Sequence, residues 1–241
     1  MANWSDPRTA TAFAPAAART GAYDEGLRSY MLSVYNRMTS AVLLTGIVAM
    51  AFAYSGAAAA VMSTPLAWVI ILAPLGFVLA FNFGFQRMQT GTMSLLFWAF
   101  AIVMGLSLST IFLRYTETSI AGAFFATAAA FAGLSLYGYT TNRNLAPLGT
   151  FLIMGVVGLI FASLINLFLQ SGTMELVISA IGVLLFAGLT AYHTQGIKSL
   201  YFEVAGTEFA GKAAIMGALQ LYLDFINMFL FILRLFGSSR D

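Results

Sequence analysis

The sequence lacks cysteine and is poor in charge. With no Cys among 241 residues, a disulfide framework, a thiolate metal site and a cysteine nucleophile are all excluded. Charged residues make up 8% of the chain, against about 25% in a typical soluble domain, and 60% of the chain is hydrophobic. A water-soluble monomer is therefore excluded. The 11 Lys and Arg residues against 9 Asp and Glu are too few to form the basic surface that nucleic-acid binding requires.

The signatures of common enzymes and energy-coupled transporters are also missing. The sequence contains no P-loop, dinucleotide fingerprint, HExxH pair or GxSxG elbow. We therefore expect no enzymatic activity and no bound cofactor.

Long uncharged stretches predict seven membrane-spanning helices. A spanning helix needs about 20 mostly apolar residues without an unpaired charge. The uncharged stretch 38–86 is long enough for two spans, near 38–55 and 66–84, because turn-forming residues interrupt it between them. Five further stretches hold one span each: 88–113, 118–142, 144–174, 176–197 and 213–236. The last of these contains two charged residues, Asp224 and Arg234.

The distribution of Lys and Arg predicts the orientation in the membrane, because cytoplasmic segments accumulate these residues. With a cytoplasmic N-terminus, eight basic residues fall inside (Arg8, Arg19, Arg28, Arg37, Arg87, Arg143, Lys198 and Lys212) and three outside (Arg114, Arg234 and Arg240). We therefore predict that the N-terminus is cytoplasmic and the C-terminus is outside.

The segment before the first span divides at residue 27. Residues 1–26 are rich in Ala, Thr and Pro without an apolar period, and we interpret them as a disordered cytoplasmic tail. From residue 27 onward, apolar side chains recur at helical spacing between polar ones: Leu27, Tyr30, Met31, Val34, Tyr35 and Met38. This pattern predicts a short amphipathic helix at the membrane interface. Residues 27–241 then form the seven-helix membrane domain.

Polar side chains at membrane depth are the most informative feature of the spans. An unpaired charge near the bilayer centre costs about 2.5–3.5 kcal/mol on insertion scales. Asp224 lies 11 residues beyond Ala213, about 17 Å along the last helix, and therefore near mid-membrane. Gln220, Asn227 and Arg234 share its side of the helix, so we predict that this polar stripe faces the bundle interior. It is either a hydrogen-bond network between helices or the lining of a hydrated path.

Two other spans contribute polar groups. His193 is the only histidine and lies five residues before Lys198, near the end of the sixth span. Asn166, with Ser163 and Gln170, gives the fifth span a polar face. Each group alone is compatible with hydrogen bonding between helices, but together they favour a polar interior.

Four segments of the chain resemble one known family. The sequence GALQLYLDFINMFLFILRLFG at 217–237 is similar to the closing helix of the transmembrane Bax-inhibitor-motif (Bax inhibitor) family, whose bacterial members share a LYLDFIN core. SLYGYTTNRNL (135–145), GTFLIMGVVGLIFASLINLFLQ (149–170) and IGVLLFAGLTAYHTQGIK (181–198) resemble the YccA-like bacterial branch of that family. The resemblance covers residues 27 to 237. It implies an all-α integral membrane protein of the bacterial inner membrane, with a central last helix surrounded by six others.

The resemblance also implies a function. Members are described as pH-sensitive calcium leak channels, in which two intramembrane aspartates share a proton and form a gate with an arginine. Asp224 matches the second aspartate of that gate, His193 stands where the first is expected, and Arg87 is the arginine near the end of the second helix. One carboxylate supplies at most two of the 6 to 8 oxygen ligands of Ca²⁺, so Asp224 would make only a weak, transient metal contact.

Three hypotheses follow. The first is a passive channel for Ca²⁺ or other cations, gated by protonation at His193 and Asp224, with Asn166, Gln220, Asn227 and Arg234 lining the pore. The alternative is a membrane regulatory protein that conducts no ions and binds a partner such as the membrane protease FtsH, which would grip the N-terminal tail. A transporter for a small solute is the third. For the channel, we expect His193 and Asp224 to approach each other, with Arg87 close by, and mild acid to strengthen their contact by protonating the imidazole.

Overall fold

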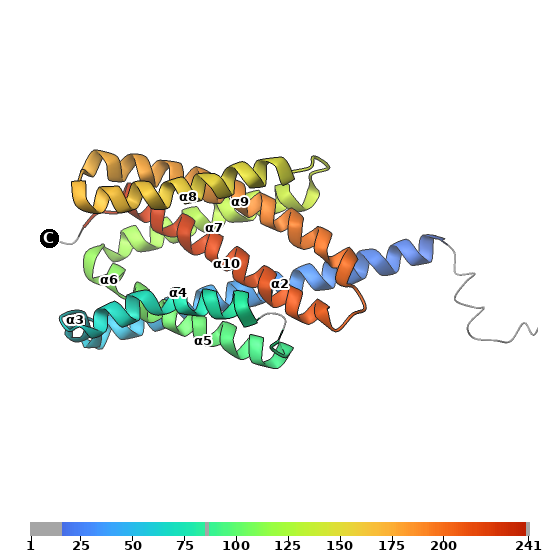
Figure 1. Ribbon diagram of the computed structural model, residues 1–241, viewed down its shortest axis with the longest axis horizontal. Helices are drawn as coiled ribbons and strands as arrows, with labels where there is room; N and C mark the ends of the chain where they lie inside the picture. Colours follow the sequence, from blue (N-terminus) through green and yellow to red (C-terminus); the bar gives the residue numbers. More distant parts are fainter. Residues whose placement is uncertain (1–15, 85–86, 240–241) are drawn as a thin grey trace, which may run out of the picture.

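The computed structural model describes residues 16–84 and 87–239, and this part of the chain is helical throughout, apart from short turns (Figure 1). Its helices are α2 (Ala16–Tyr54), α3 (Ala57–Met62), α4 (Leu66–Gly84), α5 (Thr90–Leu108), α6 (Thr110–Arg114), α7 (Glu117–Thr140), α8 (Ala146–Leu169), α9 (Gly172–Val204) and α10 (Phe209–Phe236). The predicted all-α membrane fold is confirmed. Seven helical segments are long and apolar enough to cross a membrane, with α5 and α6 forming one of them.

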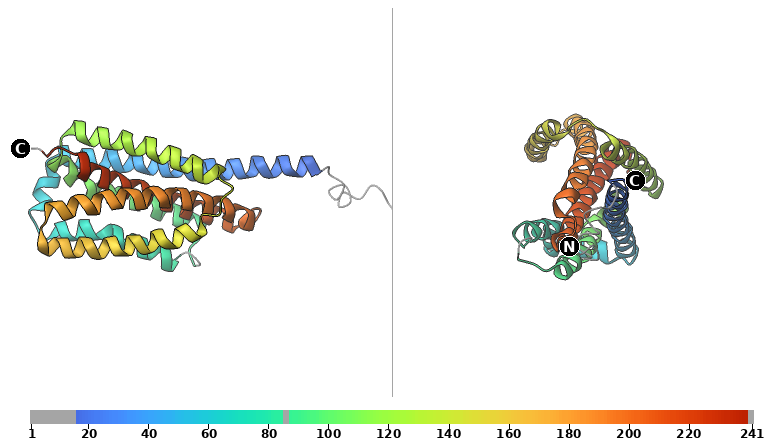
Figure 2. Two further views of the ribbon diagram at one scale, coloured as in Figure 1. Left: turned by 90° about the horizontal axis from the view of Figure 1, so that it is seen from above. Right: turned by 90° about the vertical axis from the view of Figure 1, so that its right-hand side faces the viewer.

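Helix α10 lies at the centre of the bundle. Figure 1 shows it between α7, α8 and α9 on one side and α2, α4 and α5 on the other, and Figure 2 places α4 and α8 at the periphery. In its most apolar stretch 72% of the residues are buried, against 11% in α4 and in α8. It packs on α2, α5, α7 and α9, while α4 packs mainly on α5, and α8 on α9. The last helix is therefore the most buried of the spans and forms the core of the bundle.

Small residues allow the close packing around α9. A Cβ atom at Gly138 of α7 would collide with the backbone of Ala191, and one at Gly182 would come within 2.6 Å of the Phe231 ring on α10. Glycine at these two positions therefore lets α7 and α10 approach α9 more closely than any side chain would permit.

A buried hydrogen-bond chain fixes α10 against α2 and α5. The hydroxyls of Tyr222 and Thr45 lie 2.7 Å apart, and Thr45 donates to the carbonyl of Ala101 at 2.9 Å. Because the single hydroxyl proton of Thr45 is used for Ala101, Tyr222 is the donor to Thr45. The Tyr222 ring is fully buried and packs edge-on against Phe97 and Phe100.

The predicted division at residue 27 is wrong in the described part of the chain. Residues 16–54 form one continuous helix, so residues 16–26 are helical, while residues 1–15 lie outside the described residues. The apolar face from Leu27 to Met38 is buried within the protein, and Tyr30 packs on Tyr201 of α9 at 5.3 Å between ring centroids. The same periodicity serves a helix lying on a membrane and one packed on a protein core, and here the core occupies the face.

The remaining helix boundaries follow the uncharged stretches closely. The two exceptions are α9, which begins at Gly172 rather than residue 176 and continues beyond Lys198 to Val204, and α10, which begins at Phe209 rather than Ala213. The N-terminal end of α2 and the C-terminal end of α10 lie at opposite ends of the bundle, as an odd number of spans requires (Figures 1 and 2). Which end is cytoplasmic stays a prediction.

Candidate functional site

The most polar contact in the bundle joins α9 to α10. The Nδ1 atom of His193 lies 2.7 Å from Oδ2 of Asp224, so the expected approach of these side chains is observed. The side chain of Asp224 is 4% exposed and that of His193 is 19% exposed. Among residues 16–84 and 87–239 it is the one contact of ion-pair length between an acidic and a basic side chain, and it is an ion pair only when the imidazole is protonated. A carboxyl group is thus held in the core with an imidazole as its partner.

The neighbours of Asp224 on α10 pack against aromatic side chains of other helices. Two residues before it, Tyr222 packs between α2 and α5, and one residue after it, Phe225 packs on Phe124 and Phe131 of α7, each at 5.6 Å between centroids. Apolar surroundings raise the cost of an unpaired carboxylate. The contact with His193 therefore carries most of the compensation for burying this charge.

The contact requires a proton between the two facing atoms. An ionised carboxylate only accepts hydrogen bonds, so Nδ1 must carry a hydrogen, whether the ring is neutral or cationic. A protonated carboxyl group would instead donate to a bare Nδ1. With neither group protonated at the facing atoms, two lone pairs would oppose each other and the contact would be lost. The pair can therefore respond to changes in protonation.

The predicted polar stripe occupies the least buried side of α10. Between Ala213 and Arg234, the residues that are not buried recur every three or four positions: Met216, Gln220, Leu223, Asn227, Leu230 and Arg234. We call these six residues the α10 strip. The prediction that the stripe faces the closed interior is wrong at Gln220 and Arg234, which are exposed, and Asn227 is half-buried. On a helix of 3.6 residues per turn, the strip lies between the side carrying Asp224 against α9 and the side carrying Tyr222 against α5.

The contacts of the strip are local. Asn227 donates from Nδ2 to the carbonyl of Leu223 at 2.8 Å, within its own helix. The guanidinium of Arg234 lies 5.5 Å from the centre of the Phe231 ring. Neither side chain makes a described hydrogen bond to a neighbouring helix.

Arg87 and Asn166 lie apart from the His193–Asp224 pair. Arg87 is exposed in the connection between α4 and α5, and no described ion pair joins it to Asp224, so the predicted gate with arginine is not assembled. The side chain of Asn166 accepts a hydrogen bond from the backbone N–H of Ser171 at 3.1 Å. It therefore shapes the end of α8, as Asn commonly does where a helix gives way to a turn.

Other cations near the pair are engaged elsewhere. Lys198, five residues beyond His193, donates from Nζ to the carbonyl of Tyr139 at 2.8 Å and lies 5.0 Å from the centre of its ring. Thr194 donates to Ser135 of α7 at 3.5 Å.

Sequence reasoning missed the Tyr222–Thr45 hydrogen bond, although the tyrosine two residues before Asp224 in LYLDFIN was the available signal. Among residues 16–84 and 87–239, no group of three or more His, Cys, Asp or Glu side chains is placed to hold a metal ion.

Comparison with known proteins identifies the family. The family described as "Inhibitor of apoptosis-promoting Bax1" matches residues 27–241. An uncharacterized protein of Rickettsia prowazekii is 47% identical over 220 residues, which cover 91% of this chain and 93% of that protein. The inner membrane protein YbhL of Escherichia coli is 42% identical over 219 residues, covering 89% and 94%. An uncharacterized protein of Caulobacter vibrioides is 41% identical over 230 residues, covering 90% and 92%.

These matches extend over the whole membrane domain and include the LYLDFIN helix that carries Asp224. The narrower resemblance to the YccA-like branch stays a prediction. With a family match from residue 27 to residue 241 and relatives above 40% identity over nearly their full length, the chain belongs to the Bax inhibitor family of membrane proteins.

Proposed function

We propose that this protein is a passive, pH-sensitive leak channel for Ca²⁺ or other cations, gated by the contact between His193 and Asp224. It needs no cofactor and catalyses no covalent reaction. The observation that carries the proposal is the 2.7 Å contact between an imidazole and a buried carboxylate, which links two spanning helices at membrane depth. Ionisable groups at such depth are rare and are typical of ion and proton pathways.

The α10 strip supplies the path in this proposal. It extends over 18 residues from Met216 to Arg234, about 27 Å along a helix, which approaches the roughly 30 Å thickness of the hydrocarbon core. Gln220, Asn227 and Arg234 recur along it every seven residues and are accessible from outside the packed core. Polar side chains at this depth are normally covered by protein or by water. A hydrated gap between α5 and α9 would satisfy them and pass close to Asp224.

In this proposal, the protonation state of His193 determines whether the gate is open or closed. In mild acid the imidazole becomes a cation beside the carboxylate, and the resulting ion pair holds α9 against α10. When the imidazole is neutral, the contact is reduced to one hydrogen bond from Nδ1, and the negative charge of Asp224 is no longer balanced and can attract a cation. Asp224 offers at most two oxygens, so Ca²⁺ would pass through with most of its hydration shell. We therefore propose that acid closes this channel.

The proposed location is the bacterial inner membrane, with a cytoplasmic N-terminus. The location is supported by the name of its relative YbhL, an inner membrane protein, and the orientation by the excess of Lys and Arg in the inside segments.

The test is Ca²⁺ flux into liposomes containing the purified full-length chain, measured with an enclosed indicator from pH 8 to pH 5.5. We expect flux to fall with acid in the native protein and to lose this dependence in Asp224→Asn. In His193→Asp, which restores two carboxylates, acid should no longer close the channel. Ser199→Ala, an exposed change on the same helix, is the matched control and should behave as the native protein.

Two outcomes would overturn the proposal. If correctly folded protein carries no Ca²⁺, K⁺ or Na⁺ at any pH, the channel is excluded, and the alternative of a regulatory protein that binds a partner such as FtsH would be favoured. If flux is present but identical in Asp224→Asn and the native chain, conduction does not depend on the His193–Asp224 pair.

A further inference from the structure

A long groove separates α2 from α7. One cavity of about 820 Å³ and a second of about 330 Å³ lie end to end between these helices, and both are lined by Val42, Phe124 and Phe225. Helices α2 and α7 make no extensive contact with each other, and α10 forms the floor through Phe225. We call the larger cavity the α2–α7 groove. Leu32, Leu43 and Leu136 of its lining are exposed, so the groove is open to the outside of the bundle.

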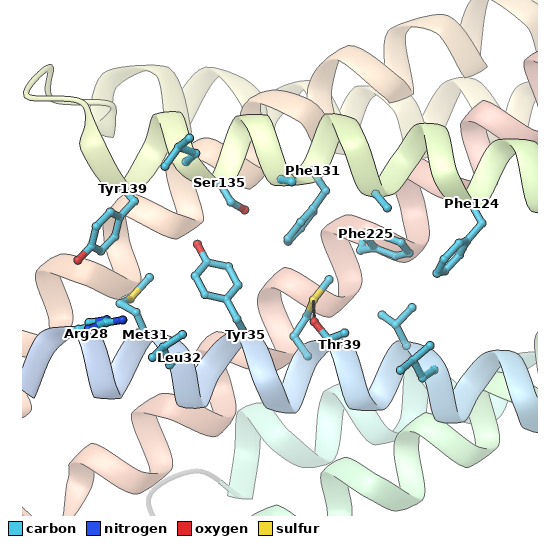
Figure 3. Close-up of a pocket in the computed structure, with 16 residues that line it drawn as sticks. Arg28, Met31, Leu32, Tyr35, Thr39, Phe124, Phe131, Ser135, Tyr139 and Phe225 are labelled. Carbon is cyan, nitrogen blue, oxygen red and sulfur yellow. Dashed lines mark hydrogen bonds between the residues drawn. The ribbon is translucent and has the colours of Figure 1, made fainter.

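The chemistry of the groove changes along its length. Figure 3 shows Arg28 and Tyr139 facing each other at one end, then Tyr35 and Ser135, and finally Phe131, Phe124 and Phe225 at the far end. Four of the five charged and hydroxyl-bearing side chains of the lining fall in the half nearer Arg28: Arg28, Tyr35, Ser135 and Tyr139. The lining of the other half is apolar apart from Thr39. Such a gradient fits an amphiphile with one polar end.

The polar end is cationic. Arg28 is exposed, and among the described residues no carboxylate lies within ion-pair distance of it. Lys198 lies directly behind Tyr139, with Nζ 2.8 Å from its carbonyl and 5.0 Å from its ring centre. The guanidinium of Arg28 and the phenolic rings of Tyr35 and Tyr139 at this end complement an anionic headgroup, and Lys198, which does not line the groove, adds positive charge nearby.

The length of the groove selects the ligand. From Arg28 to Leu43 its α2 wall covers 15 residues, about 22 Å. One leaflet of a bilayer, headgroup region included, measures roughly 20–22 Å, half of the full thickness. A lipid whose headgroup lies at Arg28 would therefore place the end of its acyl chain near Phe124 and Phe225.

We propose that the α2–α7 groove binds one anionic phospholipid from the leaflet on the Arg28 side, with its phosphate at Arg28 and one acyl chain on Phe131, Phe124 and Phe225. The site is independent of whether the protein conducts ions. It adjoins the candidate gate, because Ser135 in the groove accepts a hydrogen bond from Thr194, the residue after His193.

Native mass spectrometry of the full-length protein in detergent tests this site, with phosphatidylglycerol and phosphatidylcholine of identical acyl chains as probes. We expect phosphatidylglycerol to bind in a one-to-one complex and more tightly than phosphatidylcholine. Arg28→Gln should weaken phosphatidylglycerol binding about fivefold, because one cation near an anionic headgroup contributes on the order of 1 kcal/mol. Arg143→Gln, an exposed arginine outside the groove, is the charge-matched control and should change binding little.

A second pair of variants tests the apolar half. Ala132 lines the groove and is exposed, so Ala132→Phe would fill it and should reduce binding of both lipids about tenfold, the loss expected for roughly two displaced methylenes. Ala130→Phe, on another side of α7, adds the same ring outside the groove and should leave binding unchanged.

Three results would overturn the proposal. Equal affinity of the native chain for the two lipids would remove the anionic specificity. Unchanged binding in Ala132→Phe, with the fold verified by circular dichroism, would show that the lipid lies elsewhere on the surface. Displacement of bound phosphatidylglycerol by glycerol phosphate at a comparable concentration would mean that the site binds a free phosphate group rather than a lipid.

Discussion

Removing the imidazole of His193 alone should destabilise the protein more than removing it together with the charge of Asp224. In His193→Ala, Asp224 loses the hydrogen-bond partner that the described structure gives it, while its side chain remains only 4% exposed. Breaking a buried charged pair from one side costs about 3–5 kcal/mol, whereas a neutral hydrogen bond between membrane helices averages about 0.6 kcal/mol. Because His193 is 19% exposed, water can reach the vacated space, so we expect a loss near the lower value, about 3 kcal/mol.

The second substitution should restore part of that loss. Asp224→Asn alone keeps an oxygen that accepts a hydrogen bond from His193 and should cost about 1 kcal/mol. In the double variant that combines His193→Ala with Asp224→Asn, no charge is left unpaired. Its free energy of unfolding should therefore exceed that of His193→Ala by about 2 kcal/mol. The assay is denaturant unfolding of the purified chain in mixed micelles at pH 7, with Ser199→Ala as the control. If the two single losses simply add in the double variant, the side chains are not energetically coupled and the reasoning fails.

Three further predictions concern the packing and the orientation of the bundle. Tyr222→Phe removes the donor to Thr45 in a fully buried site, so the free energy of unfolding in micelles should fall by about 0.5–1.5 kcal/mol; no change would mean that the hydrogen bond to Thr45 adds nothing. Gly138→Leu should push α7 away from the Ala191 backbone and lower the thermal stability. Gly133→Leu is the control and should lower it less, because no atom lies within 4 Å of a Cβ added at that position. Equal stability of the two variants would contradict this packing. A reporter that works only outside the cytoplasm should be active when fused to the C-terminus, and activity only in the cytoplasmic form would reverse the predicted orientation.

The sequence was sufficient for the spans and for the central pair. Uncharged stretches of about 20 residues locate spanning helices because a buried charge is costly in hydrocarbon, and this rule holds wherever lipid surrounds the chain. The resemblance in LYLDFIN picked out Asp224, and the sole histidine picked out its partner. Their 2.7 Å contact depends on how α9 and α10 are staggered. His193 lies 5 residues before Lys198, whereas Asp224 lies 12 residues after Lys212, so the two side chains would be at different depths if both lysines marked the membrane surface. Instead, α9 extends beyond Lys198 to Val204 and α10 already begins at Phe209, which allows His193 and Asp224 to meet.

Other features could not be predicted because periodicity does not identify the neighbour of a helix face. The face from Leu27 to Met38 has the spacing of an interfacial helix, yet it is largely buried within the protein, with Tyr30 packed on Tyr201 of α9. In the same way, the spacing of Gln220, Asn227 and Arg234 correctly places them on one side of α10. Whether that side is closed or open depends on where α5 and α9 lie, which no local pattern encodes.

Two sides of α10 remain incompletely covered by its four neighbours, and their chemistries differ. Toward α2 and α7 the helix presents Phe225, and the adjoining cavities are mostly apolar, so hydrocarbon can occupy them at little cost. On the side that lies between α5 and α9 it presents Gln220, which is exposed, and Asn227, which is half-buried, and hydrocarbon is a poor solvent for both amides. One helix therefore separates a lipid-compatible side from a water-compatible side. Asp224 lies between them, so a change that tilts or rotates α10 toward either side would alter its contact with His193.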